Sequence, residues 1–369
     1  MDYNPEKLKD YYEEFPHGKP RMDGIKAAIE AADQNNDVPF MIYFREQICH
    51  EACFYGDSMY LMVVFPEMLS IIDRYPDTPS TQFDSGYVNA LDHILWVYKW
   101  LIDECSSFYQ IPMDDCLKFF EDYKKRSVSF GYNLKPYYRA LYNFYVFDEE
   151  KRADAFYNFE KIPRDSNSDC KACERNTEIG FYLDKGDFGR AVELSKDIEN
   201  FKLKCGNYWD AWLRMKISFL DYYLNSCMFE EASEIAGLLE HRINEYEKIE
   251  YQAWDLIINC YAHTKPGRAL RLYKKHWKQL EDGTPHDLFD SASNICCFWD
   301  RIRRDGRETV RLHLDRTFSL YNEENIYKTE DLFNYYYSLA KDIAGKFDKR
   351  NNASSYMETL AKSLDIARK

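Results

Sequence analysis

Three cysteines and one histidine are the residues of this sequence best suited to chemistry. Cys170 and Cys173 lie three residues apart in the first turn of a predicted helix, so both thiols face the same side. Cys205 comes just before the first helix of the next predicted pair, and His241 lies in the second helix of that pair. Three thiolates and one imidazole would match a closed structural zinc site with four ligands.

The same residues allow other interpretations. Asp169 and Asp210 are the other candidates for a fourth zinc ligand. A reversible disulfide within the set is a second interpretation, because helix N-termini lower the pKa of a thiol and favour the thiolate. Plain burial is the third, since cysteine is common in helical cores. There is one CxxC and no second pair, so the sequence leaves all three interpretations open.

These residues converge only if the chain forms a regular array of helix pairs. A short phrase recurs about every 40 residues, as YLDKGDFGRAVEL at 182–194, YLNSCMFEEASEI at 223–235 and YAHTKPGRALRL at 261–272. Each copy joins an apolar helix to a second helix through a polar turn, with an alanine just inside the second helix. In such an array, successive first helices begin at the same end, about 10 Å apart. This arrangement brings Cys170, Cys173 and Cys205 together.

The recurring phrase carries a resemblance to a known superfamily. Tetratricopeptide repeats have a glycine before the turn and an alanine where the two helices cross. Gly186 and Ala191 keep that spacing, and Cys227 and Thr264 hold the glycine position in the next two units. The chain therefore resembles the tetratricopeptide superfamily. Further stretches resemble uncharacterised bacterial proteins of this kind, namely Arg45 with its helix, LWVYKW at 95–100, and SDCKAC at 168–173 followed by Cys205.

The resemblance implies an all-α fold, a right-handed α-solenoid of antiparallel helix pairs, and it implies no particular ligand. Helical periodicity predicts N-terminal helices over 22–33, 39–54, 57–74, 85–105 and 113–127. The predicted pairs are 135–147/150–161, 169–185/188–200, 207–225/229–245, 249–263/266–281, 286–303/306–321 and 328–346/351–367. We expect an irregular helical region over 1–133, continuous with repeats over 134–369.

Composition narrows the classes of function. The 369 residues carry a formal net charge of −14, which disfavours nucleic acid as a partner. The longest apolar run, Met59 to Phe65, is far shorter than the ~20 residues that a membrane helix needs, so we expect no membrane span. The N-terminus lacks a signal-peptide pattern, and 11 cysteines in a chain of this size favour reduced thiols in a cytoplasmic protein.

The common catalytic motifs are missing from the sequence. It has no GxxxxGK or GxGxxG phosphate loop and no GxSxG nucleophile elbow. His50-Glu51 lacks the second histidine of a zinc protease. Arg45 and His50 match the loose Arg-x4-His pattern of a helical ribonuclease group, which the acidic charge disfavours. Lys99, set among aromatic residues, is either a buried cation or a lysine whose amine reaches water along its stem.

We therefore expect a non-enzymatic scaffold whose concave groove binds a protein or peptide. Tyrosines such as Tyr335–Tyr337 either line that groove or pack in the core. The alternative function is a peptide-, redox- or metal-responsive regulator that acts through a protein partner, with the three cysteines as its switch. An enzyme in the N-terminal half is a third hypothesis, and it predicts a polar pocket near Arg45, His50 or Lys99. The oligomeric state is not predicted.

Overall fold

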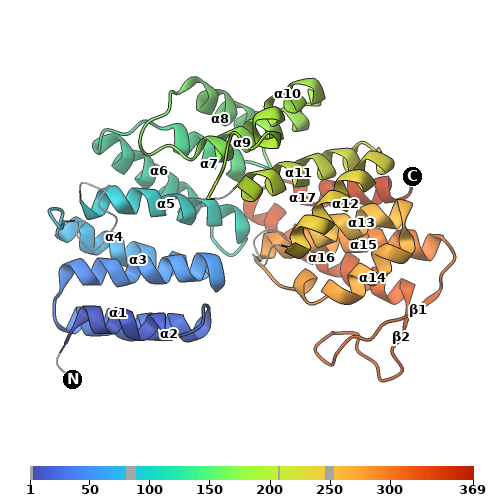
Figure 1. Ribbon diagram of the computed structural model, residues 1–369, viewed down its shortest axis with the longest axis horizontal. Coiled ribbons are helices and arrows are strands. Elements are labelled where there is room, and N and C mark those ends of the chain that lie inside the picture. Colours follow the sequence, from blue (N-terminus) through green and yellow to red (C-terminus); the bar gives the residue numbers. More distant parts are fainter. Residues whose placement is uncertain (1–2, 80–88, 207, 246–252) are drawn as a thin grey trace. The chain divides into compact units, whose positions relative to one another are not determined.

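The fold is taken from a computed structural model that describes residues 3–79, 89–206, 208–245 and 253–369 (Figure 1). Most of the described residues are helical and only two short strands occur among them, which confirms the all-α class. They form two compact units, Met1–Ser168 and Asp169–Lys369. The sequence pattern changes near residue 134, within the first unit, whereas the units divide after Ser168. No helix of the described chain is long and apolar enough to cross a membrane.

The first unit is a stack of helices in which neighbours along the chain pack against each other. They are α1 (Pro5–Glu13), α2 (Lys19–Gln34), α3 (Val38–Tyr55), the short 3-10 helix η1 (Ser58–Tyr60), α4 (Leu61–Arg74), α5 (Ala90–Ser107), α6 (Met113–Ser129), α7 (Lys135–Phe144) and α8 (Glu149–Lys161). Aromatic rings fill much of its core. The largest fully buried side chains are Phe44, Phe65, Tyr98, Phe120, Tyr123, Phe144, Phe156 and Phe159.

The second unit consists mainly of helix pairs. Its helices are α9 (Lys171–Asp184), α10 (Phe188–Glu199), α11 (Tyr208–Asn225), α12 (Phe229–Glu245), α13 (Trp254–Thr264), α14 (Pro266–His276), α15 (Pro285–Arg304), α16 (Thr329–Asn351) and α17 (Ser355–Ala367), with the 3-10 helix η3 (Gln279–Glu281). Each helix of a pair packs against its partner. The first helices also form a series, because α9 contacts α11, α11 contacts α13 and α13 contacts α15.

The recurring phrase marks the same turn in two successive pairs. Gly186 and Cys227 both adopt the left-handed conformation, with φ of 72° and 59°. In each turn the next residue donates a backbone hydrogen bond five residues back, Asp187 to Tyr182 at 2.8 Å and Met228 to Tyr223 at 2.9 Å. This bond closes a helix C-terminus in the manner of a Schellman motif. The alanines that follow are fully buried, as expected for close helix crossings: Ala191, Ala232 and Ala269.

The helix predicted over 306–321 is wrong. This segment contains strand β1 (Thr309–Arg311), which pairs antiparallel with β2 (Ile326–Lys328), and α15 packs instead against α16. The segment that carries the two strands extends beyond the helices of this unit (Figure 1). The segment is not helical because its apolar residues recur with a period of two: Val310, Leu312 and Leu314 are buried, and the residues between them are exposed. Alternation of this kind favours an extended chain.

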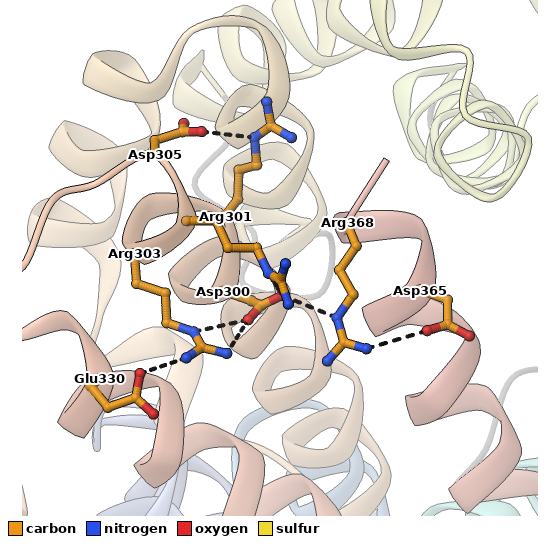
Figure 2. Close-up of polar contacts among 8 residues, drawn as sticks. Asp300, Arg301, Arg303, Asp305, Glu330, Asp365 and Arg368 are labelled. Carbon is orange, nitrogen blue, oxygen red and sulfur yellow. Dashed lines mark hydrogen bonds and ion pairs between the residues drawn. The ribbon is translucent and has the colours of Figure 1, made fainter.

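A buried carboxylate joins the last three helices of the second unit. Asp300 on α15 is fully buried, and its oxygens accept hydrogen bonds from Arg303 at 2.5 Å and Arg304 at 2.9 Å. Arg368, which follows α17, lies 3.5 Å from the same carboxylate, and Arg303 also bonds Glu330 of α16 (Figure 2). Three guanidinium groups therefore surround one buried carboxylate. A buried charge is strongly destabilising unless it is paired, so these contacts are needed for Asp300 to stay buried.

Candidate metal centre

The N-terminus of α9 holds the first two cysteines of the predicted site. Cys170 is the N-cap residue, and its Sγ accepts a hydrogen bond from the backbone N–H of Cys173 at 3.3 Å. An N-cap side chain normally satisfies one of the unpaired N–H groups of the first turn. Here a sulfur takes that role. The helix start therefore fixes the Cys170 thiol over its own first turn, beside Cys173.

Cys205 completes a group of three sulfurs, although 32 positions separate it from Cys173 in the chain. The Sγ atoms of Cys173 and Cys205 are 3.3 Å apart, and all three sulfurs lie within 4.8 Å of one another. A tetrahedral zinc with Zn–S bonds of about 2.3 Å places its sulfurs roughly 3.8 Å apart. The separation of Cys173 and Cys205 is about half an ångström shorter than that value, and no pair of the three sulfurs is more than 4.8 Å apart. A metal ion therefore fits the group with small adjustments of the side chains.

The thiols share protons unequally. Hydrogen bonds from the thiols of Cys173 and Cys205, together with backbone N–H groups of the first turn, lower the pKa of Cys170. The same interaction with Cys170 raises the pKa of Cys173 and of Cys205. Arg214 on α11, with Nη1 3.9 Å from the Cys173 sulfur, opposes that rise. These opposite shifts favour Cys170 as the thiolate, and a cation that binds all three sulfurs displaces the protons that Cys173 and Cys205 hold.

The structure leaves the fourth ligand undefined. Among the described residues, the possible metal ligands that lie within 4.8 Å of one another in a group of three or more are Cys170, Cys173 and Cys205. His241 lies exposed on α12 and is outside the group, as are Asp169 and Asp210. The three cysteines thus come together as predicted, while His241 as the fourth ligand stays a prediction. Three thiolates with one open position also allow a water or a partner's side chain to complete the tetrahedron.

The other charged residues that the sequence singled out have structural contacts. Lys99 is buried, with 3% of its surface exposed, and its amine donates to the carbonyl of Asn167 at 3.0 Å. The same Nζ lies 3.3 Å from the centre of the Trp96 ring. Of the two interpretations of Lys99, the buried cation is therefore correct. Arg45 makes two 2.8 Å hydrogen bonds to Asp33. Arg45 thus joins α3 to α2, and Lys99 joins α5 to the turn that contains Asn167.

A cavity of about 340 Å³ lies beside His50 in the first unit. It is lined by Tyr12, Glu13, His17, Arg21, Ile25, Gln47, His50 and Glu51. The enzyme hypothesis predicted a pocket near this position. However, Nδ1 of His17 lies 3.0 Å from Glu51, and Nη1 of Arg21 lies 3.1 and 3.3 Å from the two ring nitrogens. Both ring nitrogens of His17, the cavity histidine that contacts a carboxylate, therefore lie against other protein groups.

Of the three adjacent tyrosines, the middle one belongs to the core. Tyr336 is fully buried, and its hydroxyl lies 3.0 Å from that of Tyr273 and 3.1 Å from Glu281. Its neighbours Tyr335 and Tyr337 are half-buried.

A scan with protein-family models finds no match to the chain, and curated proteins provide no significant match. The case for a function therefore depends on the geometry of the site.

Proposed function

We propose that this chain is a zinc-binding regulatory scaffold of the helical-repeat class. The observation that supports it is the convergence of the Cys170, Cys173 and Cys205 sulfurs, all within 4.8 Å of one another. The remaining eight cysteines form no such group within the described chain. Burial in a helical core explains single cysteines, but it does not explain three sulfurs gathered from one helix start and a separate segment.

A bound zinc would connect the start of α9 to the segment that precedes α11. Three thiolates supply most of the binding energy, and His241 or an exchangeable ligand takes the fourth position in this proposal. Because metal binding stabilises only the state in which the ligands are assembled, occupancy changes the stability of the second unit. That change gives the metal a means of controlling a protein partner, with no chemistry performed on a substrate.

The same sulfurs support a redox form of this proposal. Cys173 and Cys205 are 3.3 Å apart, and a disulfide requires a separation of about 2.05 Å, so only a small side-chain movement is needed. Hydrogen peroxide would oxidise the two thiols, forming one S–S bond and releasing two water molecules. A thiolate on Cys170 next to them favours exchange between alternative disulfides.

The scaffold part of the proposal follows from the architecture. We infer that the paired helices of the second unit belong to a tetratricopeptide-like α-solenoid, whose inner surface binds a protein or peptide. The support is the recurring turn, with matching left-handed residues at Gly186 and Cys227 and fully buried alanines after it. Solenoids of this kind offer extended binding surfaces because each repeat adds a similar face.

The metal function is tested by zinc titration of the chelator-treated full chain, followed by calorimetry. We expect one zinc per chain, and a loss of at least tenfold in affinity when Cys173→Ser removes one ligand. Cys53→Ser, a half-buried cysteine of the first unit, is the matched control and should leave the affinity unchanged. Cobalt substitution adds a spectroscopic readout, because thiolate ligands produce a charge-transfer band. Binding that is equal in both variants would disprove the site.

A further inference from the structure

The three sulfurs of the candidate metal centre can be reached from solvent. Cys170, Cys173 and Cys205 are all half-buried, whereas six of the other eight cysteines are fully buried. A fully buried thiol meets only other parts of the protein, but a half-buried thiol can also meet a solute. The group is therefore open to a small inorganic species that enters from solution.

The fold itself holds these sulfurs together. The first turn of α9 positions Cys170 and Cys173, through the hydrogen bond from the Cys173 N–H to the Cys170 sulfur. Cys205 lies in the segment between α10 and α11. In that region the ring of Phe201 packs edge-on against Trp209, with 5.0 Å between the ring centres. A ligand that binds all three sulfurs therefore has to order little of the chain, which favours tight binding.

The spacing of the sulfurs favours an ion whose three bonds make narrow angles. The Cys173 and Cys205 sulfurs are 3.3 Å apart, closer than the roughly 3.8 Å of a tetrahedral zinc site. In trivalent arsenic a lone pair occupies the fourth position, so the three bonds form a pyramid with angles closer to a right angle. Because As–S and Zn–S bonds are similar in length, the narrower angles bring the sulfurs closer together than zinc does.

The number of ligands favours the same ion. A structural zinc site takes four protein ligands, whereas three possible metal ligands converge at this position among the described residues. Pyramidal arsenic is complete with three bonds. All three groups are thiols, and soft thiolate ligands select soft ions over ions that prefer oxygen ligands.

We propose that Cys170, Cys173 and Cys205 bind trivalent arsenic, which reaches the site as arsenous acid, and that arsenic is the signal to which the scaffold responds. Arsenous acid, As(OH)3, loses three As–O bonds and gains three As–S bonds. Each thiol proton leaves with one hydroxide as water, and a thiolate on Cys170 takes the equivalent proton from solvent. Three water molecules are released, and the arsenic stays trivalent. This inference rests on the proposed function, because it uses the same three sulfurs.

Calorimetry with sodium arsenite and the chelator-treated full chain, kept reduced by a phosphine, tests the proposal. We expect one arsenic per chain. Cys173→Ser should weaken binding about a hundredfold, because the third sulfur binds intramolecularly at a high effective concentration. Cys205→Ser, which lies outside the helices, should do the same and serves if Cys173→Ser does not fold. Circular dichroism verifies the fold of each variant.

Two control variants and a second probe identify three-sulfur binding. Cys53→Ser and His241→Asn should each change arsenite affinity less than twofold, since neither residue belongs to the pyramid. Phenylarsine oxide has two exchangeable positions, so Cys173→Ser should weaken its binding less than tenfold. Arsenite binding that Cys173→Ser leaves unchanged would overturn the proposal. So would an equal loss in His241→Asn and Cys173→Ser, or an equal loss of arsenite and phenylarsine oxide in Cys173→Ser.

Zinc titration of the same variants distinguishes failure of this inference from failure of the proposed function. Zinc binding that depends on Cys173, without arsenite binding, would overturn the arsenic proposal and leave the zinc function in place. Arsenite binding that depends on Cys173, without zinc binding, would support the arsenic proposal and disprove the zinc function. If neither ion depends on Cys173, the three sulfurs do not act together and both proposals are wrong.

Discussion

Replacing Asp255 with asparagine should stabilise the second unit at neutral pH. Asp255 is buried, with 7% of its surface exposed, and burial raises its pKa to about 6 from an ordinary 3.8. The folded state therefore holds the proton more tightly than the unfolded state. Stability is lost as the pH rises from about 4 to about 6, because the folded protein must then carry a buried charge. Above that range the charge costs about 3 kcal/mol, at about 1.4 kcal/mol for each pKa unit.

Asparagine keeps the contact but not the charge. Its side-chain oxygen can still accept the hydrogen bond that Asn294 gives to Asp255. Relative to the unchanged chain, Asp255→Asn should therefore gain about 3 kcal/mol of unfolding free energy at pH 7.5. At pH 4.5 the gain should fall to about 1 kcal/mol, since the folded protein then keeps Asp255 protonated and the difference reflects only the ionisation of this residue in the unfolded chain.

Urea denaturation of the full chain, followed by circular dichroism at both pH values, measures this difference. The comparison uses the variant minus the unchanged chain, so other titrating groups cancel. Asp342→Asn, which removes an exposed carboxylate of α16, provides the control and should produce no comparable gain. A stabilisation that does not depend on pH would refute the reasoning, as would a gain over the unchanged chain that is smaller at pH 7.5 than at pH 4.5.

Three other outcomes follow from the structure. Zinc affinity should rise with pH, because Cys173 and Cys205 hold their protons tightly and must release them when the metal binds. We expect about two protons released per zinc ion. Calorimetry in buffers of different ionisation enthalpy measures this release. Asp300→Ala should lower the free energy of unfolding by about 3 kcal/mol, because three guanidinium groups lose the carboxylate that they share. Urea denaturation measures this loss, and the control Asp305→Ala, which removes an exposed carboxylate, should lower the free energy of unfolding by less than about 1 kcal/mol. Lys99→Met should cost about 1–3 kcal/mol by removing the donor to the Asn167 carbonyl, seen as a lower midpoint in thermal unfolding.

Helix positions were largely predictable because they depend on local periodicity. The predicted helix over 229–245 coincides with α12, and the predictions for α6 and α10 differ from the structure by one or two residues. The convergence of the three cysteines was also predictable, since the register of helix pairs determines which helix ends are adjacent. The hairpin at β1 and β2 was missed because its alternating pattern is only a few residues long and adjoins a long helix.

Lys99 and Asp255 show the other limit of sequence reasoning. Both are charged residues in predicted helices, and their spacing alone does not say whether they face water. Only the packing of the folded chain buries them, so that 3% of Lys99 and 7% of Asp255 is exposed. Electrostatic effects of this kind depend on distance and solvent exclusion across the fold, which spacing along one chain does not specify.

By itself, the sequence determined the helical class, most helix ends and the grouping of Cys170, Cys173 and Cys205, because hydrophobic period, turn residues and helix register are local properties. The tertiary structure alone decided that Lys99 and Asp255 are buried and that α15 packs against α16. Those outcomes depend on which surfaces exclude water when distant helices pack, and that exclusion is a property of the folded chain as a whole.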